Sequence, residues 1–166
     1  MTAELARGAT LVVATMAMGL IAGLFYAYAC SAMLGLRRTD DRTFIDVMQR
    51  INIAIQNGWF ILSFFGALVF TSLAAVLHVV GGERSALLPV AVALVLYVVA
   101  LVITYRVNIP LNNELERAVP PDRIVDPAAV RERFEMTWVR WNIVRAVLCT
   151  AAFGCLCWAL ILHGRA

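Results

Sequence analysis

Amide side chains, one arginine and aromatic rings recur at helical spacing in three separate segments of the sequence. The segments carry Gln49, Asn52 and Gln56; Asn108 and Asn112; and Trp138, Asn142 and Arg145. Residues three, four or seven positions apart share one face of a helix. Amides and guanidinium groups donate hydrogen bonds, so a pocket lined by these faces would hold a ligand that carries oxygen atoms. The alternative is structural: the amides cap helix ends, and the tryptophans form an aromatic belt at a membrane surface.

The elements that carry these faces are predicted to be transmembrane helices. Hydrophobic residues make up 62% of the 166-residue chain, and charged residues make up only 15%. A helix of about 20 apolar residues crosses the hydrocarbon core of a bilayer. We therefore expect an all-α membrane protein, a single domain over residues 1–166 built as a bundle of four transmembrane helices. The four spans are expected at about residues 9–36, 52–80, 85–108 and 138–163.

The arginine residues indicate how this bundle is oriented. Eleven of the fourteen arginines lie in or beside the two long connections, between spans 1 and 2 and between spans 3 and 4. The positive-inside rule then places these connections in the cytoplasm and both termini outside. We expect an integral protein of a plasma membrane, such as a bacterial inner membrane, with its polar faces at the cytoplasmic end.

Amphipathic helical extensions are predicted before spans 2 and 4. Residues 43–56 form one extension that runs into span 2, and Asp40 or Asp41 can cap its first turn. Residues 125–141 form the other extension, which runs into span 4 and begins near Asp126.

The end of span 3 is expected to be irregular. Pro110 lacks a backbone N–H group and disfavours helical geometry at the residue before it. We therefore expect a break or a kink that frees carbonyl groups and orients Asn108 and Asn112.

Small residues recur at every fourth position of span 1, among them Gly19 and Gly23. Small residues let transmembrane helices approach closely. Packing inside the bundle explains this pattern first, and a homodimer through span 1 explains it second.

Other kinds of site are weakly supported. His78 and His163 would lie near the outer ends of spans 2 and 4, but no carboxylate or thiol has the spacing to complete a metal site with them. We therefore expect no bound metal. The sequence contains no phosphate-binding loop, nucleophile elbow or nucleic-acid module, so nucleic acid is not an expected partner.

The order and spacing of the polar motifs resemble a family of small integral membrane proteins that includes the anthrone oxygenases of polyketide pathways. The resemblance covers nearly the whole chain. Its matching pieces are Phe25-Tyr26, Met48-Gln49-x-x-Asn52, Asn108-x-Pro110-Leu111-Asn112 and Trp138-x-x-x-Asn142-x-x-Arg145. The resemblance implies a membrane-embedded monooxygenase that acts on a hydrophobic anthrone or phenolic polyketide-type substrate with O₂. It also implies that no metal, flavin or other cofactor is needed.

The resemblance further implies roles for single residues. Loss of a proton turns an anthrone into an electron-rich enolate that can pass an electron to O₂, while the protein supplies a dry pocket and fixed donors. The implied catalytic residues are Arg145 as the fixed cation and Asn52, Asn108, Asn112 and Asn142 as oxyanion donors. The implied substrate-binding residues are Tyr26, Gln49, Trp138, Trp141 and Glu114. Tyr26 and Glu114 are also the candidates for the base. The alternative function is that of a small-molecule transporter or a partner-binding membrane subunit without enzymatic activity.

Overall fold

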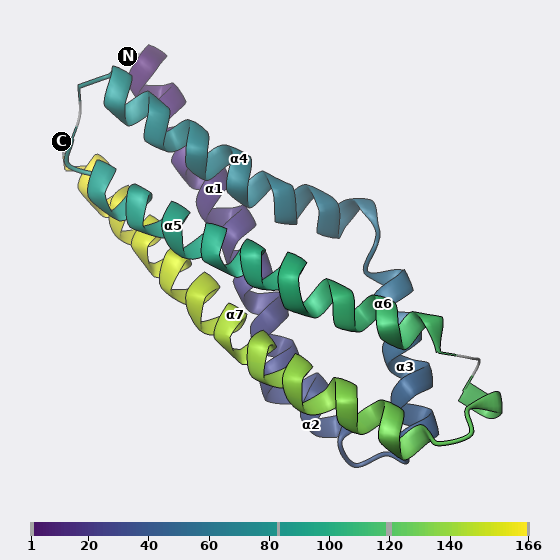
Figure 1. The fold of residues 1–166 in the computed structure, drawn as a ribbon. Helices are drawn as coiled ribbons and strands as arrows, with labels where there is room; N and C mark the ends of the chain where they lie inside the picture. The colour runs from purple at the N-terminus through teal and green to yellow at the C-terminus, as the bar shows by residue number, and fades with distance from the viewer. Residues whose placement is uncertain (1, 83, 119–120, 166) are drawn as a thin grey trace.

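The computed structural model describes residues 2–82, 84–118 and 121–165, and these residues form a bundle of long helices (Figure 1). Four helical stretches are long and apolar enough to cross a membrane. They are Ala3–Leu36, Gly58–Val80, Leu87–Arg117 and Pro127–His163. The prediction of an all-α, four-span membrane bundle is therefore confirmed, and the chain is an integral membrane protein. Both termini lie at one end of the bundle (Figure 1).

Two of the four spans contain short π-helical segments, in which the backbone is wound more widely than in an α-helix. In chain order the elements are α1 (Thr2–Ala27), the π-helix η1 (Tyr28–Ala32), α2 (Met33–Leu36), α3 (Asp41–Ala54), α4 (Gly58–Val80), α5 (Leu87–Ile103), the π-helix η2 (Thr104–Asn108), α6 (Ile109–Arg117), the 3₁₀ turn η3 (Pro121–Arg123) and α7 (Pro127–His163). Helix α1 packs against α4 and α7, and α5 packs against α7 and α4.

Small side chains allow the spans to pack closely. The buried alanines include Ala14 on α1, Ala67 and Ala74 on α4, Ala93 and Ala100 on α5, and Ala152 and Ala159 on α7. In a bilayer, close van der Waals packing replaces the hydrophobic effect as the force between helices. Gly19 belongs to this packing, because a Cβ atom there would lie 3.0 Å from the ring of Phe153. Gly23 has no neighbour within 4 Å of such an atom. The homodimer through span 1 stays a prediction.

The predicted caps of the two extensions are present. Asp40 accepts hydrogen bonds from the backbone N–H of Thr43 at 3.1 Å and from its hydroxyl at 2.6 Å. These two hydrogen bonds hold the pKa of the exposed Asp40 carboxyl below its usual range, and the bond from the Thr43 hydroxyl has the larger effect. Asp126 accepts a hydrogen bond from the backbone N–H of Ala129 at 3.1 Å and so begins α7. The extension before span 4 is continuous with that span, as predicted.

The extension before span 2 does not run into the span, so that part of the prediction is wrong. Helix α3 ends at Ala54, and α4 begins at Gly58, later than the predicted start at residue 52. The reason is Asn57, whose side-chain oxygen accepts hydrogen bonds from the backbone N–H groups of Trp59 and Phe60 at 3.0 and 3.1 Å. Such an N-cap starts a new helix in a new direction.

Helix α3 lies outside the four spans and buries one apolar stripe. Phe44, Ile45, Met48 and Asn52 are its buried residues. The apolar members of this stripe pack against Leu115, Phe134 and other side chains of α6 and α7. Asn52, the last residue of the stripe, is thereby directed toward the ends of the spans.

The prediction at Pro110 was a break or a kink, and the chain does not break there, so the first of these alternatives is wrong. The chain stays helical from α5 through η2 into α6. The π-helix supplies the reason: the backbone N–H of Ile109 bonds to Thr104 O, five residues back, so the wider turn leads directly into Pro110. Single π-helical turns inside α-helices are rare and often occur at functional sites.

Candidate functional site

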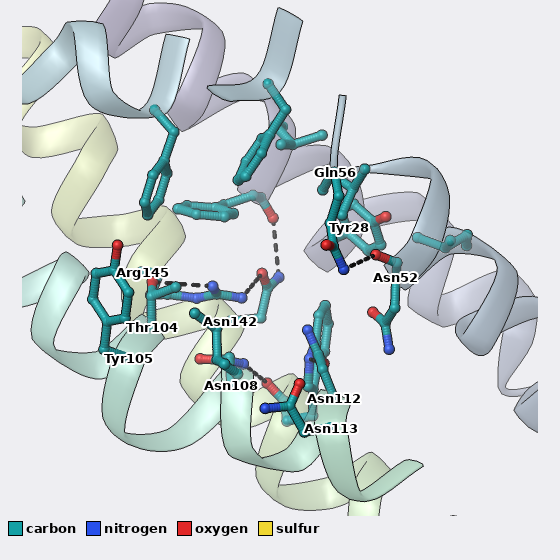
Figure 2. Close-up of a pocket in the computed structure, with 18 of the residues that line it drawn as sticks. Tyr28, Asn52, Gln56, Thr104, Tyr105, Asn108, Asn112, Asn113, Asn142 and Arg145 are labelled. Atoms are coloured by element: carbon teal, nitrogen blue, oxygen red, sulfur yellow. Dashed lines mark hydrogen bonds between the residues drawn. The ribbon is translucent and has the colours of Figure 1, made fainter. Parts of the chain in front are cut away.

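A cavity of about 390 Å³ lies at the end of the bundle opposite the chain termini. Pockets that bind small molecules usually measure roughly 300–1,000 Å³. Its walls come from all four spans and from α3. The polar and aromatic residues among its lining are Phe25, Tyr28, Asn52, Gln56, Phe60, Phe64, Phe65, Thr104, Tyr105, Asn108, Asn112, Asn113, Glu116, Trp138, Asn142 and Arg145. Figure 2 shows ten of these residues around one central space.

Arg145 is the central charge of this cavity. Its side chain is only 4% exposed. Its Nη1 donates to Thr104 Oγ1 at 3.2 Å, and its Nη2 donates to Asn142 Oδ1 at 3.0 Å (Figure 2). Its guanidinium carbon lies 4.2 Å from the ring centroid of Phe25 and 5.7 Å from that of Trp138. Neutral oxygens and aromatic faces therefore surround the cation, and no ion pair with a carboxylate is found for it among the described residues.

Aromatic and neutral neighbours stabilise a buried cation without cancelling its charge. A cation over a desolvated aromatic face gains about 2 kcal/mol. Burial of a charge costs several kcal/mol, and a carboxylate partner is the usual compensation. Arg145 thus keeps a positive potential that is available to an anionic or strongly polar group in the cavity.

Three polar atoms of the lining are buried and have no hydrogen-bond partner within the described part of the chain. They are Asn52 Nδ2, Asn108 Oδ1 and Arg145 Nε. An unsatisfied buried polar atom costs about 1–3 kcal/mol. Two of these atoms are donors and one is an acceptor, and each belongs to a side chain that lines the cavity.

The remaining amides of the lining hold neighbouring groups in place. Asn142 Nδ2 donates to Phe25 O at 3.1 Å and so joins α7 to α1. Trp138 Nε1 donates to Asn112 Oδ1 at 2.8 Å and joins α7 to α6. Asn108 Nδ2 donates to Trp138 O at 3.4 Å. Each of these bonds crosses between two spans, so the polar lining also fixes the relative positions of the helices.

Six of the ten residues predicted for the site line the cavity: Asn52, Asn108, Asn112, Trp138, Asn142 and Arg145. Their catalytic and binding roles stay predictions. Residues at the spacings i, i+3, i+4 and i+7 share one face of a helix, as Trp138, Asn142 and Arg145 do. The prediction used these spacings, and for these six residues it identified the face that lines the cavity.

Four predicted residues lie elsewhere. Tyr26 is 61% exposed on the outer surface of the bundle. Gln49 donates from Nε2 to Leu115 O at 2.8 Å and fixes α3 to α6. Trp141 is partly buried on α7 and is not among the lining residues. Glu114 lines a second cavity of about 250 Å³, beside Arg117 and Arg133.

The sequence interpretation missed two residues whose spacing could have identified them. Tyr28 continues the stripe of Met18, Ile21 and Phe25, which are buried on α1. Glu116 lies four residues after Asn112 and therefore on the same helix face, whereas Glu114 does not. Thr104 and Tyr105 were missed because they lie inside η2, where the wider winding shifts the faces of the helix.

The two histidines meet at the other end of the bundle. The rings of His78 and His163 have centroids 5.5 Å apart, and His78 is fully buried. His78 Nδ1 lies 2.7 Å from Ala74 O. No group of three potential metal-binding side chains occurs among the residues that the structure describes.

Comparison with known proteins gives one match. A family model described as anthrone oxygenase matches residues 59–155, which is more than half of the chain. The matched range runs from the start of α4 into α7 and includes Thr104, Asn108, Asn142 and Arg145, whereas Tyr28 and Asn52 lie outside it. Neither the curated proteins nor the solved structures gave a match.

Proposed function

The chain belongs to the anthrone oxygenase family, as its sequence motifs predicted, and from this membership we propose that it is a membrane-embedded oxygenase of a hydrophobic anthrone or related phenolic polyketide. The observation that carries this proposal is Arg145, a buried cation at a cavity wall that is satisfied by neutral groups only. Oxidation of an anthrone by O₂ passes through an enolate and a peroxide, and both are anions that such a cation stabilises.

The proposed reaction starts with loss of a proton from the carbon opposite the anthrone carbonyl. The electron pair of that C–H bond moves into the ring, and the carbonyl oxygen becomes an enolate oxygen beside Arg145. The enolate passes one electron to O₂, the superoxide joins the carbon radical at the same position, and the resulting peroxide anion takes up a proton to become a hydroperoxide. Loss of water from the hydroperoxide then leaves a second carbonyl. One oxygen atom of O₂ stays in the anthraquinone, and the other leaves as water.

The asparagines of the cavity suit the two ends of such a substrate. Asn52 Nδ2 can donate to an enolate or peroxide oxygen, and Asn108 Oδ1 can accept from a phenolic hydroxyl, because both atoms lack a partner among the described residues. The aromatic rings of Phe25, Phe64 and Trp138 offer flat apolar surfaces to the fused rings of an anthrone.

Glu116 is the proposed base. It is the carboxylate that lines the cavity, whereas Glu114 lines the second one. Glu116 is exposed at the rim, so a proton that it accepts can pass to water. Tyr26, the other base expected from the sequence, points away from the cavity on the outer surface.

The test measures O₂ uptake with an anthrone such as emodin anthrone, using purified protein in vesicles with no added metal or flavin. Anthrones also oxidise spontaneously, so the control is the same preparation of Arg145→Ala. We expect the wild-type protein to accelerate uptake, and treatment with a chelator to leave the rate unchanged. Equal rates for wild type and Arg145→Ala across several anthrones would contradict the proposal and favour a binding or transport function.

A further inference from the structure

The lining of the main cavity changes in character along the bundle axis. Its polar rim consists of three exposed residues: Gln56 in the connection between α3 and α4, and Asn113 and Glu116 on α6. We call these three residues the mouth. Tyr105 lies eight residues before Asn113, which is about 12 Å along a helix. Figure 2 shows Tyr105 at the left, beside Arg145, and Asn113 at the bottom of the view.

Three residues that line the cavity farther from its polar rim are also about half exposed. Ile61 and Phe65 of α4 both line the cavity, yet each is 48% exposed, and Tyr105 of η2 lines it and is 50% exposed. Side chains that border a cavity and also reach the outer surface mark a place where the cavity approaches that surface. We call Ile61, Phe65 and Tyr105 the window.

The packing of the helices explains the window. Helix α4 packs against α1 and α5, whereas η2 and α6 pack against α5, α7 and α3. Helix α4 therefore faces η2 across the cavity. Between these two elements only side chains separate the cavity from the outer surface. The capped break at Asn57 sets the start of α4 apart from α3, which lies on α6.

On the α4 side of the window the exposed side chains suit a lipid environment, whereas Arg106 is exposed beside Tyr105 on the other side. Trp59 at the start of α4 is 83% exposed, as is typical of tryptophans at a membrane surface. Phe65 lies six residues further along the same helix, about 9 Å deeper. The next exposed side chains of α4, Leu62 and Val69, are apolar. We therefore expect acyl chains, and not water, outside the α4 side of the window.

From this geometry we propose that the substrate enters sideways from the bilayer through the window, with Ile61 and Tyr105 as the residues that control its passage. The inference rests on the proposed function and identifies the substrate as a planar, membrane-dissolved molecule. The mouth is then the path by which protons and the water formed from O₂ leave the cavity. A planar aromatic ketone partitions into lipid, so the window meets a higher substrate concentration than the mouth does.

The experiment follows binding of 1,8-dihydroxyanthraquinone, a product-like probe that cannot be oxidised further at the reacting carbon, by its visible absorption in stopped flow. The protein is reconstituted in phosphatidylcholine vesicles, and binding starts when these vesicles are mixed with the probe at several lipid concentrations. Ile61→Trp narrows the window, Ile61→Ala widens it, and Asn113→Trp narrows the mouth. Leu62→Trp is the matched control, because Leu62 neighbours Ile61 on α4 but does not line the cavity.

We expect Ile61→Trp to slow association and dissociation of the probe together by about tenfold, since a gate changes rates more than affinity. Ile61→Ala should accelerate both, and Leu62→Trp should match the wild type. Association should follow the mole fraction of probe in the lipid and not its total concentration. Thermal unfolding of each variant checks that it is folded, and Ile61→Ala gives a second reading if Ile61→Trp is not.

Other outcomes separate the two proposals. Slower association in Asn113→Trp, with wild-type rates in both Ile61 variants, would overturn entry from the bilayer in favour of entry from water. The proposed function would survive that result, because the probe still binds. A wild-type protein that does not bind the probe at all would overturn both proposals.

Discussion

The two ends of the bundle bury polar side chains in different surroundings. At the cavity end, the partnerless atoms belong to Asn52, Asn108 and Arg145, and all three residues line one cavity of about 390 Å³. Farther from the cavity, Thr71 Oγ1 and His78 Nε2 also have no hydrogen-bond partner among the described residues, but both residues are fully buried and line neither of the cavities described above. An unsatisfied group in a packed core costs stability, whereas one at a cavity wall can bind a ligand.

The backbone differs between the two ends in the same way. The cavity end holds both π-helices, the cap at Asn57 and Pro110. The opposite end is formed by uninterrupted helices whose buried alanines allow close packing. Irregular helix within a membrane is tolerated where it is buried in protein or lines a cavity. The irregular end is therefore where a function is to be sought.

The largest contrast is expected in cysteine labelling, because the two ends of the bundle should lie on opposite sides of the membrane. In a background with Cys30, Cys149, Cys155 and Cys157 replaced, Asp122→Cys should resist an impermeant maleimide in intact cells, and Gly164→Cys should react. The reason is the arginine excess at the cavity end. Both positions are exposed, so both should react after the cells are opened. The reverse pattern in intact cells would place the cavity on the outer side.

The next largest effect is expected at Arg145. Arg145→Lys should retain the fold but slow anthrone oxidation by about a hundredfold, the typical loss when one donor to an oxyanion is removed. An ammonium group cannot donate to Thr104 and Asn142 while lying flat on Phe25, as the guanidinium does. The measurement is O₂ uptake in vesicles. Arg140→Lys on the same helix, at an exposed position, is the control and should keep its activity. Full activity in Arg145→Lys would remove Arg145 from the catalytic site.

A pair of carboxylates tests the boundary of the cavity end. Glu116→Gln should slow turnover, by about a hundredfold if Glu116 is the base for every turnover, and Glu114→Gln should leave it unchanged. The two residues lie on one helix but line different cavities. A solvent-exchange measurement of the benzylic hydrogen isolates the proton-transfer step, and a loss confined to that step assigns the role. Slower turnover in Glu114→Gln alone would restore the residue that the sequence motifs suggested.

The regular parts of the fold could be predicted from sequence patterns, and the irregular parts could not. Four spans, the caps at Asp40 and Asp126 and the face of Trp138, Asn142 and Arg145 follow from composition and period alone. The break at Asn57 was missed because an asparagine can lie inside a helix or cap the next one, and packing decides between these. The π-helix was missed because no period identifies it; Pro110 indicated a disturbance, but its form depends on the hydrogen bond of Ile109.

The choice between neighbouring residues was harder for the sequence than the choice between faces. Tyr26 and Tyr28, or Glu114 and Glu116, differ by two positions and therefore by about 200° around a helix. The family resemblance favoured Tyr26, and none of its matching sequence pieces contains Tyr28. The buried stripe from Met18 through Phe25 indicates Tyr28, so helical period was the better guide where the two disagreed.

The smallest effect is expected in the packed part of the bundle, at two glycines of α1. Gly19→Ala should destabilise the protein by about 1 kcal/mol, the lower end of the cost of overpacking, because its new methyl group would lie 3.0 Å from the ring of Phe153 and that ring must move. Gly23→Ala is the matched control, since nothing lies within 4 Å of the added atom. Thermal unfolding in mild detergent measures both variants, and a loss of about 1 kcal/mol should lower Tm by about 2–4 °C.

Light scattering of the same samples tests the homodimer through span 1. If Gly23 forms that contact, Gly23→Ala should shift a dimer toward monomer without a change in monomer stability. If Gly23→Ala instead lowers Tm as much as Gly19→Ala does, the contrast between an open and a filled face of α1 is wrong.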